Sequence, residues 1–544
     1  MHINRLKKVI KVFLIILAIL LIIVIAIVGC ALITYHKQPV LTKEDKEELS
    51  VDNIWKTRTE PEMAEVIEDN GDALLERIKL ISNARDEIIL STFDFRADDS
   101  GKLILGALLD ASERGVSVNV IVDGVSGFLR MNGNPYFEAL AAGEGTSIKI
   151  YNKVNPFAPW KSMGRLHDKY LIADRSSYII GGRNTFSYFL GSSSPYKNYD
   201  RDALVYCENP DENSSVNDIL SYFGKVWNYK ESKAFISGVN AITDTDTYFT
   251  ISQNNEYNYC EESTYSDNNS VDSSRIEAKK DKLSAKKNKL AAKKNKLAAK
   301  KKVAAAREEL HSLYADYCAD NADNGIYKGL GESVYKDMFK DAYEVNNVAL
   351  LSNPIEYSSK KPYVWYQLVE LMKKADSRVK LHTPYIICND YMYEGLKSVC
   401  DTVDDVSLMT NSVANNGNPF GSADYYVNKN RILGTGIDVW EYEGGYSYHG
   451  KSVLIDDNIS VIGSFNIDMR SAYLDTELML VIDSKDINRE LNQSMEGYER
   501  VARKADKDGS YDNPYNVKPV ELSSYRERQM KLIKNFALWA RYLF

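Results

Sequence analysis

Hydrophobic residues occur along this chain in two different patterns. An unbroken apolar run of 22 residues extends from Val12 to Ile33. Elsewhere, short apolar runs alternate with stretches in which apolar residues recur every three or four positions. The long run predicts a helix in an apolar environment, whereas the alternation predicts buried strands and amphipathic helices. The chain is therefore expected to join a membrane-spanning helix to an α/β fold.

Two regions repeat the alternation of helix and strand. The first is expected to form helices at 73–84 and 103–114 and strands at 87–92 and 116–122. The second is expected to form a helix at 363–375 and strands at 378–383, 406–410 and 437–442. Strands that alternate with helices in this way build a largely parallel sheet. Two regions of similar order indicate an internal duplication, with a site between the halves.

The long apolar run can cross a bilayer core of about 30 Å. The basic residues before it favour a cytoplasmic tail, with the rest of the chain outside the cytoplasm; they are Arg5, Lys7, Lys8 and Lys11. A cleaved signal peptide is one alternative. A lipoprotein signal is another, because residues 27–30, which end at Cys30, resemble a lipobox. The run continues to Ile33, however, which favours an uncleaved, single-pass anchor in the cell membrane.

A lysine-rich segment separates the two regions. Its sequence repeats every seven residues from Lys279 to Ala299, with leucines at Leu283, Leu290 and Leu297. Lys, Leu and Ala are strong helix formers, but a coiled coil needs a second apolar row, which is missing here. A single basic helix is therefore expected. It is either a solvated spacer, the favoured interpretation, or a helix that binds an anionic membrane surface.

Charge is distributed unevenly. The chain carries −8 overall, of which the segment from Arg275 to Arg307 carries +12 and the remainder −20. Nucleic acid is bound largely by neutralising its phosphates, so no nucleic-acid partner is expected. The six cysteines contain no CxxC pair, which argues against a zinc site. Cys388 and Cys400 are expected to be free thiols, although an oxidising compartment would allow them to pair.

The segment from Arg526 to Phe544 mixes basic and apolar residues at helical spacing. Such a helix lies either in the membrane interface or against the second half of the fold. Six units are thus expected along the chain: tail and anchor (1–36), linker (37–64), first half (65–250), basic helical insert and linker (251–340), second half (341–505) and basic amphipathic segment (506–544).

Two copies of one motif carry the candidate chemistry. Each reads His-x-Lys-x4-Asp, and in both an Asn at the end of a Gly-containing segment lies 17 residues after the His. Matched spacing in two copies indicates two related half-sites rather than isolated polar residues. The candidate residues are His167, Lys169, Asp174 and Asn184 in the first copy and His449, Lys451, Asp456 and Asn466 in the second.

Strand periodicity brings the members of each copy together. His167 and Lys169 are two residues apart and therefore point to one face of a strand. A hairpin turn between residues 175 and 176 then places Asn184 opposite His167. The second copy repeats this arrangement about a turn between residues 457 and 458. The motif aspartates fall at the turns, so they are expected to fix the hairpins rather than to contact a substrate.

An imidazole, an ammonium group and an amide on one patch suit a phosphodiester. The Lys and Asn side chains can hold the phosphoryl oxygens and stabilise the charge of the transition state. One neutral histidine can attack phosphorus. The other, when protonated, can give its proton to the leaving alcohol and later deprotonate the acceptor. Because the lysines supply positive charge, neither a metal ion nor another cofactor is expected.

A nucleophilic histidine needs a hydrogen-bond partner on its other ring nitrogen. Glu477 lies downstream of the second motif in a segment that resembles the one around Asp202, downstream of the first. Glu477 and Asp202 are therefore the candidate orienting carboxylates, and Asp200 competes with Asp202 for this role. The intervals from the motif His differ, at 28 residues for Glu477 and 35 for Asp202.

The paired motifs resemble those of the phospholipase D superfamily over roughly residues 65–230 and 345–500. The segments 181–189 and 463–477 are most similar to bacterial cardiolipin synthases, although Asp475 stands where those synthases have Asn. The resemblance implies two α/β/α halves with mixed sheets around a pseudo-twofold axis. It also implies phosphatidyl transfer through a phosphohistidine, with the first-motif His as nucleophile. Many of these synthases have two membrane spans where one is expected here, and the basic insert is foreign to their pattern.

The expected activity is therefore transfer of a phosphatidyl group between phospholipids, with phosphatidylglycerol as substrate and the membrane as the place of action. Hydrolysis is one alternative, because it shares the same intermediate and differs only in using water as acceptor. A surface nuclease of the same superfamily is another, against which the apolar run and the acidic charge both count. A membrane tether without activity is a third, but a tether has no use for two complete motifs.

Overall fold

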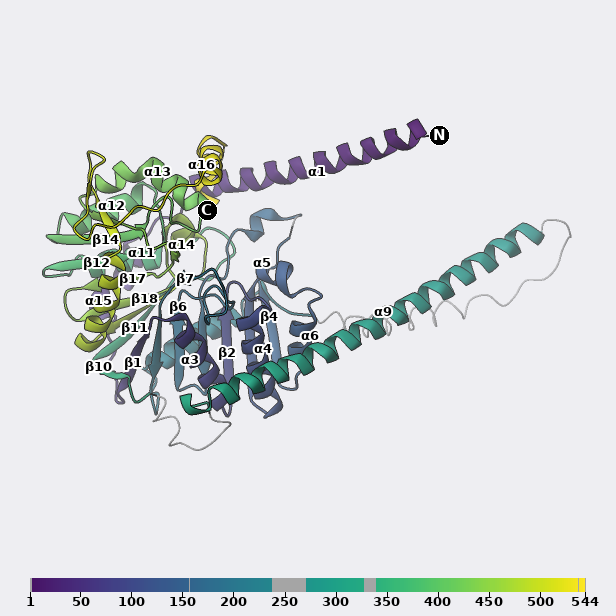
Figure 1. The fold of residues 1–544 in the computed structure, drawn as a ribbon, viewed down its shortest axis with the longest axis horizontal. Coiled ribbons are helices and arrows are strands. Elements are labelled where there is room, and N and C mark those ends of the chain that lie inside the picture. Colours follow the sequence, from purple (N-terminus) through teal and green to yellow (C-terminus); the bar gives the residue numbers. More distant parts are fainter. Residues whose placement is uncertain (1, 156, 237–270, 327–338, 537, 544) are drawn as a thin grey trace.

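The computed structural model describes residues 2–155, 157–236, 271–326, 339–536 and 538–543. A body of two nine-stranded sheets and their helices carries two long projecting helices, α1 (His2–His36) and α9 (Val271–Asp320) (Figure 1). The expected α/β architecture with two mixed sheets is confirmed.

The first sheet has the strand order β10-β1-β8-β6-β5-β2-β3-β4-β9. Three neighbouring strands are parallel, and antiparallel strands flank them on both sides. The parallel strands are β2 (Glu87–Thr92), β3 (Ser117–Asp123) and β4 (Thr146–Tyr151). The others are β1 (Glu62–Ile67), β5 (Tyr170–Ala173), β6 (Ser177–Gly181), β8 (Asp202–Tyr206), β9 (Ser232–Ala234) and β10 (Tyr343–Val345).

The second sheet has the order β11-β20-β18-β17-β12-β14-β15-β21-β22. Its first eight strands match β1-β8-β6-β5-β2-β3-β4-β9 one by one in order and direction, which confirms the duplication. The strands are β11 (Asn347–Ser352), β12 (Arg378–His382), β14 (Asp405–Asn411), β15 (Asp438–Tyr442), β17 (Ser452–Ile455), β18 (Ile459–Gly463), β20 (Leu478–Asp483), β21 (Ala502–Ala505) and β22 (Tyr511–Asp512).

Polar side chains determine where several of the covering helices begin. Asp69, Asp98, Asn389 and Ser484 each accept a hydrogen bond from a backbone N–H of the first turn that follows. The helices of the first half are α3 (Asn70–Asn83), α4 (Asp99–Glu113), α6 (Pro135–Ala141) and α7 (Ser215–Trp227). Those of the second half are α11 (Tyr363–Met372), α12 (Asp390–Cys400), α13 (Pro419–Leu433) and α15 (Lys485–Glu499).

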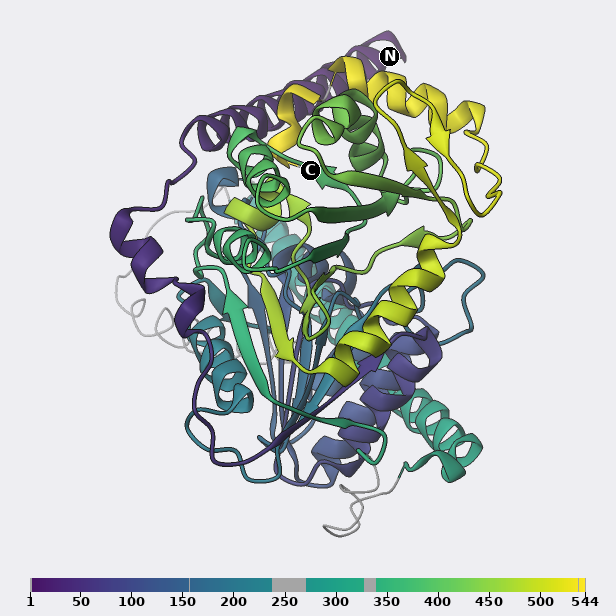
Figure 2. The same ribbon diagram turned by 90° about the vertical axis from the view of Figure 1, so that its left-hand side faces the viewer.

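The three largest buried apolar clusters hold these layers together. One lies between the first sheet and α3, α4 and α6, and a second lies between the second sheet and α11, α12 and α13. The third is shared, because it joins Ile180 and Val205 of the first sheet to Leu454 and Leu480 of the second. Separation of the halves would expose this cluster to water, so the two sheets form one unit (Figure 2).

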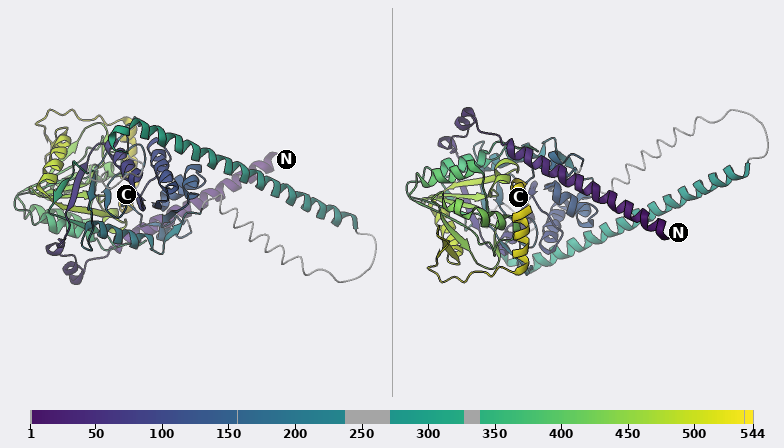
Figure 3. Two further views of the ribbon diagram at one scale, coloured as in Figure 1. Left: turned by 90° about the horizontal axis from the view of Figure 1, so that it is seen from below. Right: turned by 90° about the horizontal axis from the view of Figure 1, so that it is seen from above.

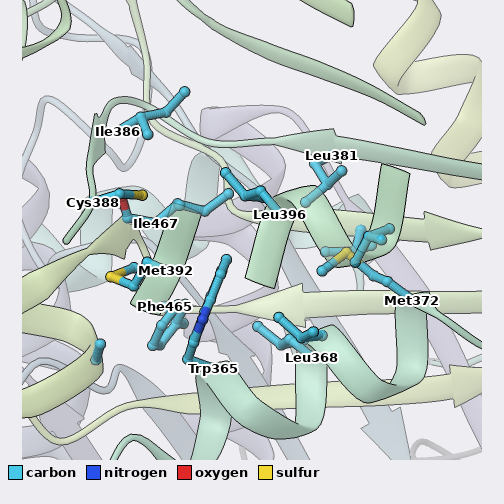
Figure 4. Close-up of a cluster of buried hydrophobic side chains, with 14 of the residues drawn as sticks. Trp365, Leu368, Met372, Leu381, Ile386, Cys388, Met392, Leu396, Phe465 and Ile467 are labelled. Carbon is cyan, nitrogen blue, oxygen red and sulfur yellow. The ribbon is translucent and has the colours of Figure 1, made fainter. Parts of the chain in front are cut away.

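The cluster of the second half also supports a motif residue. Trp365 of α11 is 1% exposed, and its ring stacks on that of Phe465 with centroids 6.3 Å apart (Figure 4). Phe465 directly precedes Asn466. The buried tryptophan therefore helps to fix the chain where it delivers this amide.

Each motif hairpin has a register one residue away from the expected one. In the first, Ala173 pairs with Ser177, so the turn is centred on Arg175, and in the second, Ile455 pairs with Ile459. The expected hairpin centres, between residues 175 and 176 and between 457 and 458, were wrong because an odd number of residues, three, forms each loop. The first residue of each loop is the motif aspartate, which adopts a positive φ of 50° or 52°. Aspartate tolerates this left-handed conformation better than most residues.

The helix α1 contains a candidate membrane span, Lys7–Cys30, that is long and apolar enough to cross a bilayer. Its last turns contact the body, at η3 (Pro159–Ser162) and at η5 (Leu538–Leu543) (Figure 2). Cys30 packs against the core of the second half. Cys388 and Cys400 are free thiols, as expected, whereas Cys260 lies outside the described residues.

The helix α9 confirms the expected single helix in the lysine-rich insert. Its last third packs on α4 and α6, where Leu310 and Tyr314 are buried and Glu309 binds Lys102 at 2.6 Å. The preceding part leaves the body on the same side as α1 (Figures 1 and 3). An exposed Leu297 agrees with the absence of a second apolar row.

The carboxyl-terminal segment packs on the second half, which was one of the two expected alternatives; the other was the membrane interface. Met530 and Ile533 of α16 (Ser524–Phe536) are buried, and this helix contacts α13. Beyond it, Arg541 of η5 binds Asp424 of α13 through two hydrogen bonds of 2.6 and 2.7 Å.

Candidate active site

Both motif histidines lie where one half of the fold contacts the other. Leu166 forms a parallel bridge with Thr476, and the backbone N–H of His167 donates to Thr476 Oγ1 at 3.0 Å. In the second motif, β16 (Ser447–Tyr448) pairs in parallel with β7 (Asn198–Tyr199) of the first half. Each motif therefore enters the site alongside a segment from the opposite half.

As a consequence, each histidine is oriented by a carboxylate from the other half. His167 Nδ1 lies 2.8 Å from Glu477 Oε1, and His449 Nδ1 lies 2.6 Å from Asp200 Oδ2. Both carboxylates are fully buried. With Nδ1 bound to a carboxylate, Nε2 of each imidazole is left for chemistry, as in a catalytic triad.

The structure places Glu477 as a histidine partner, but it corrects the choice of Asp202. The Asp202 carboxylate accepts hydrogen bonds from Arg77 at 2.9 Å and from Arg183 at 3.0 Å. Strand register explains the error, because Gly181 pairs with Asp202 whereas the equivalent Gly463 pairs with Met479, the second residue after Glu477. Asp200, the competing candidate, lies two residues before Asp202 and therefore corresponds to Glu477.

Glycine at position 182 allows Asp200 to reach its histidine. A Cβ at Gly182 would lie 2.4 Å from Asp200 Oδ1, far inside van der Waals contact. Glycine at this position thus leaves room for the Asp200 carboxylate beside the backbone.

The two motif lysines are buried next to the imidazoles. Lys169 Nζ donates to the carbonyl of His167, and Lys451 Nζ donates to that of His449. Lys451 Nζ also lies 2.6 Å from His449 Nδ1 and 3.8 Å from Asp200 Oδ2. Both lysines are 2% exposed, so both ammonium groups lie in the protein interior.

The motif amides and aspartates have different surroundings. Asn466 Nδ2 donates to Tyr385 Oη at 3.2 Å, while Asn184 Oδ1 accepts from the backbone N–H of Asp94 at 3.3 Å. Asp174 and Asp456 lie away from the histidines and accept hydrogen bonds from three consecutive backbone N–H groups each, at 85–87 and 376–378 respectively. They fasten the hairpins to the starts of β2 and β12.

Burial and mutual charge shift the acid–base properties of the site. Burial lowers the pKa of Lys169 and of Lys451 to about 8. Burial and the neighbouring ammonium group lower the pKa of His449 to about 4, and they hold that of His167 well below its ordinary value. Both imidazoles are therefore neutral at pH 7 in the free protein.

The two orienting carboxyl groups differ. Burial raises the pKa of Glu477 to about 8, although Lys169 and two serine hydroxyls act against it. Burial acts in the same direction on Asp200, but Lys451 and His449 outweigh it and hold its pKa below the usual range. Asp200 is thus firmly ionised, so the His449 pair is better able to stabilise an imidazolium.

Several supporting residues escaped the sequence reasoning. Ser464 and Ser471 donate to the Glu477 carboxylate, which leaves it an acceptor for His167 Nδ1–H. Arg183 donates to the carbonyl of Asp200 as well as to Asp202. Ser464 and Arg183 belong to the Gly-containing segments after the motifs, and this position is the signal that could have identified them.

A cavity of about 600 Å³ opens beside His167. Most of its lining is apolar, and polar groups gather near the motif residues. It is lined by Ile23, Ile27, Phe93, Val125, Val154, Asn155, Pro159, Ser162, Met163, Arg165, His167, Tyr385, Asn466, Asp468, Arg470, Asp475 and Leu543.

Similarity to known proteins agrees with this geometry. A protein of Helicobacter pylori that has no assigned function is 22% identical over 468 residues, which cover 80% of this chain and 78% of that one. Cardiolipin synthase A of Yersinia pseudotuberculosis is 29% identical over 153 residues, only 28% of this chain and 30% of the synthase. The crystal structure of phosphatidylserine synthase from Haemophilus influenzae has the same fold, with a TM-score of 0.53, 15% identity and coverage of 92% of this chain and 99% of that one.

The family model described as "Cardiolipin synthase, PLD-like domain" matches residues 77–227 and 368–498, slightly more than half of the chain. These two segments contain both histidines, both lysines and both orienting carboxylates. The chain belongs to this family of phospholipase D-like proteins.

Proposed function

We propose that this protein is a membrane-anchored phosphatidyltransferase of the cardiolipin synthase type. The observation that carries the proposal is the pair of histidines, each oriented by a buried carboxylate from the opposite half. A scaffold or tether has no need of two oriented imidazoles. The family membership and the apolar helix beside the site favour a phospholipid as substrate, and phosphatidylglycerol is the proposed donor.

In the first step, His167 Nε2 attacks phosphorus and forms a phosphatidyl-histidine. Glu477 accepts a hydrogen bond from His167 Nδ1–H and so keeps the lone pair of Nε2 available for the attack. The P–O bond to glycerol breaks, and the glycerol oxygen takes a proton from Nε2 of protonated His449. Binding of an anionic phosphate between the lysines favours that proton, and ionised Asp200 stabilises the imidazolium.

In the second step, neutral His449 removes a proton from the hydroxyl group of a second lipid. The resulting oxygen attacks phosphorus, the P–N bond to His167 breaks, and the histidine returns to its starting state. Lys169 and Lys451 stabilise the phosphoryl oxygens in both steps. Phosphatidylglycerol as donor and acceptor thus yields cardiolipin and glycerol.

Reconstitution of the full chain with labelled phosphatidylglycerol tests the proposal. Labelled cardiolipin and free glycerol are expected from the wild type and neither from His167→Ala. Phosphatidic acid as the sole lipid product would identify water as the acceptor and a hydrolase as the function. Cleavage of DNA without any lipid turnover would identify the nuclease alternative, against which the charge of −20 outside the basic insert counts.

The anchor is proposed to be uncleaved and single-pass, with the catalytic body outside the cytoplasm. The packing of Cys30 against the body supports retention of the helix, because cleavage would expose to water the apolar surface that the helix covers. Protease accessibility of the body in intact spheroplasts tests its sidedness.

A further inference from the structure

We propose that the cavity beside His167 is a lateral entrance through which one acyl chain of the phospholipid passes from the membrane to the active site. The proposal rests on the proposed function and names a binding site for its substrate. The last turns of α1 and the loop that carries η3 form two walls of this cavity.

The cavity connects the candidate membrane span with a catalytic residue. Ile23 and Ile27 line it from α1, Val154 and Met163 line it from the loop, and His167 belongs to the same lining. A volume of about 600 Å³ lies within the range of ligand pockets, roughly 300–1,000 Å³.

The position of these isoleucines along α1 sets the depth of the cavity in the bilayer. The candidate span ends at Cys30, three residues after Ile27 and seven after Ile23. At about 1.5 Å per helical residue, they lie ~5 and ~10 Å inside that end. The hydrocarbon core is about 30 Å thick, so both lie at the level of the acyl chains of the adjacent leaflet.

The loop opposite α1 carries exposed apolar side chains. Phe157 is 90% exposed, Trp160 54% and Val154 39%, and η3 in this loop contacts α1. Large apolar side chains grouped at one surface indicate contact with an apolar phase, and tryptophan favours the membrane interface. The loop is therefore expected to dip into the leaflet and to keep water from the mouth of the cavity.

Polarity changes along the lining in the way that a phospholipid requires. The apolar residues of α1 and the loop give way to Tyr385, Asn466 and His167, and to Asp468, the pKa of which burial raises to about 7. Arginine side chains are also present, but Arg165 is paired with Asp123 and Arg470 with Asp475. The lining thus offers apolar surface for a chain and polar groups for a phosphate, whereas a nucleic acid would need unpaired basic groups.

Photolabelling can detect the chain directly. The full-length protein is placed in phosphatidylglycerol vesicles that contain a small fraction of the same lipid with a diazirine at the end of one acyl chain. Met163 is only 7% exposed, so lipid reaches it only by entering the cavity. We expect labelled peptide containing Met163. The label should fall at least fivefold in Ile27→Trp, whose indole fills the mouth, and stay unchanged in Ile25→Trp, because Ile25 is 60% exposed on α1.

Turnover gives an independent measurement. The ratio of turnover of long-chain lipid to that of short-chain, water-soluble phosphatidylglycerol should fall about tenfold in Ile27→Trp and stay constant in Ile25→Trp. Absence of label at Met163 together with an unchanged ratio would overturn the entrance while leaving the transferase intact. Label at Met163 without turnover of either lipid would retain the entrance and overturn the proposed function.

Discussion

His449 Nδ1 and Asp200 Oδ2 are 2.6 Å apart, although the histidine belongs to the second half of the fold and the carboxylate to the first. His167 and Glu477 repeat the relationship in the opposite direction. The site is therefore a product of the contact between the halves, and each half contributes the histidine of one pair and the carboxyl group of the other.

Replacing either orienting carboxyl group by an amide should reduce catalysis without unfolding the protein. In Asp200→Asn and Glu477→Gln the amide no longer fixes the required tautomer, and we expect kcat to fall about 10³-fold. Asp202→Asn is the contrasting variant, because Asp202 binds two buried arginines. It should cost about 3–5 kcal/mol of stability while folded molecules keep most of their kcat. Thermal melting beside kcat per folded molecule separates the two classes, and equal kcat losses in Asp200→Asn and Asp202→Asn would refute the assignment.

Both histidines should be indispensable, since each performs a different step. His167→Ala and His449→Ala should each abolish turnover. Acid-free trapping with labelled donor should give a phosphorylated peptide containing His167. In His449→Ala this species should accumulate only with a donor whose leaving group needs no proton, because the general acid is missing. A trapped peptide containing His449 would reverse the roles of the two residues.

Gly182→Ala should displace Asp200, because the new Cβ would lie 2.4 Å from its carboxylate oxygen. We expect a drop in kcat close to that of Asp200→Asn. Gly224→Ala in α7 is a matched control, because no atom lies within 4 Å of its added Cβ. Wild-type activity in Gly182→Ala would mean that the carboxylate has another route to His449.

The pH dependence of kcat/KM should have an alkaline limb near pH 8. Lys169 and Lys451 must be protonated to bind the phosphoryl oxygens, and burial lowers the pKa of each to about 8. Activity is thus lost as the pH rises through that value. On the acid side, the pKa of His167 is held well below its ordinary value, so activity should persist through pH 6.5.

Arginine keeps its charge throughout this range. In the Lys169→Arg, Lys451→Arg double variant the alkaline limb should therefore move to higher pH, even though the maximal rate falls. A limb that stays at pH 8 would show that neither lysine is the group whose deprotonation ends activity.

The lysine repeats of α9 are proposed to be an arm that holds the body against anionic lipid. Deletion of 279–302 ends just before Val303, which packs on the first half, so the packed part of α9 is retained. In a variant that also lacks residues 2–22, the deletion should weaken binding to anionic vesicles, since each Lys near the surface contributes about 1 kcal/mol. The difference should shrink as salt rises, because the Debye length falls from ~30 Å at 0.01 M to ~8 Å at 0.15 M. Replacing these lysines by arginine should preserve binding, and unchanged binding of the deletion variant at low salt would leave the arm a solvated spacer.

The elements with strong periodic patterns were predictable from the sequence. The strand expected at 87–92 is β2, and the helix expected at 73–84 overlaps α3. The repeated motifs also predicted that each lysine lies beside its histidine and that Glu477 contacts a motif histidine. What failed depended on register and on contacts between the halves. Asp200 and Asp202 differ by two residues, and only the pairing of Gly181 with Asp202 shows which one corresponds to Glu477.

The distance along the chain between His167 and Glu477, 310 residues, has a consequence for biosynthesis. A ribosome completes the anchor and the first motif long before it adds the glutamate that holds His167. Until then the imidazole of the nascent chain has no fixed tautomer, even where α1 has entered a bilayer as proposed. Bilayer lipids next to an unfinished polypeptide are thus expected to escape attack until the last part of the second half has been synthesised and folded.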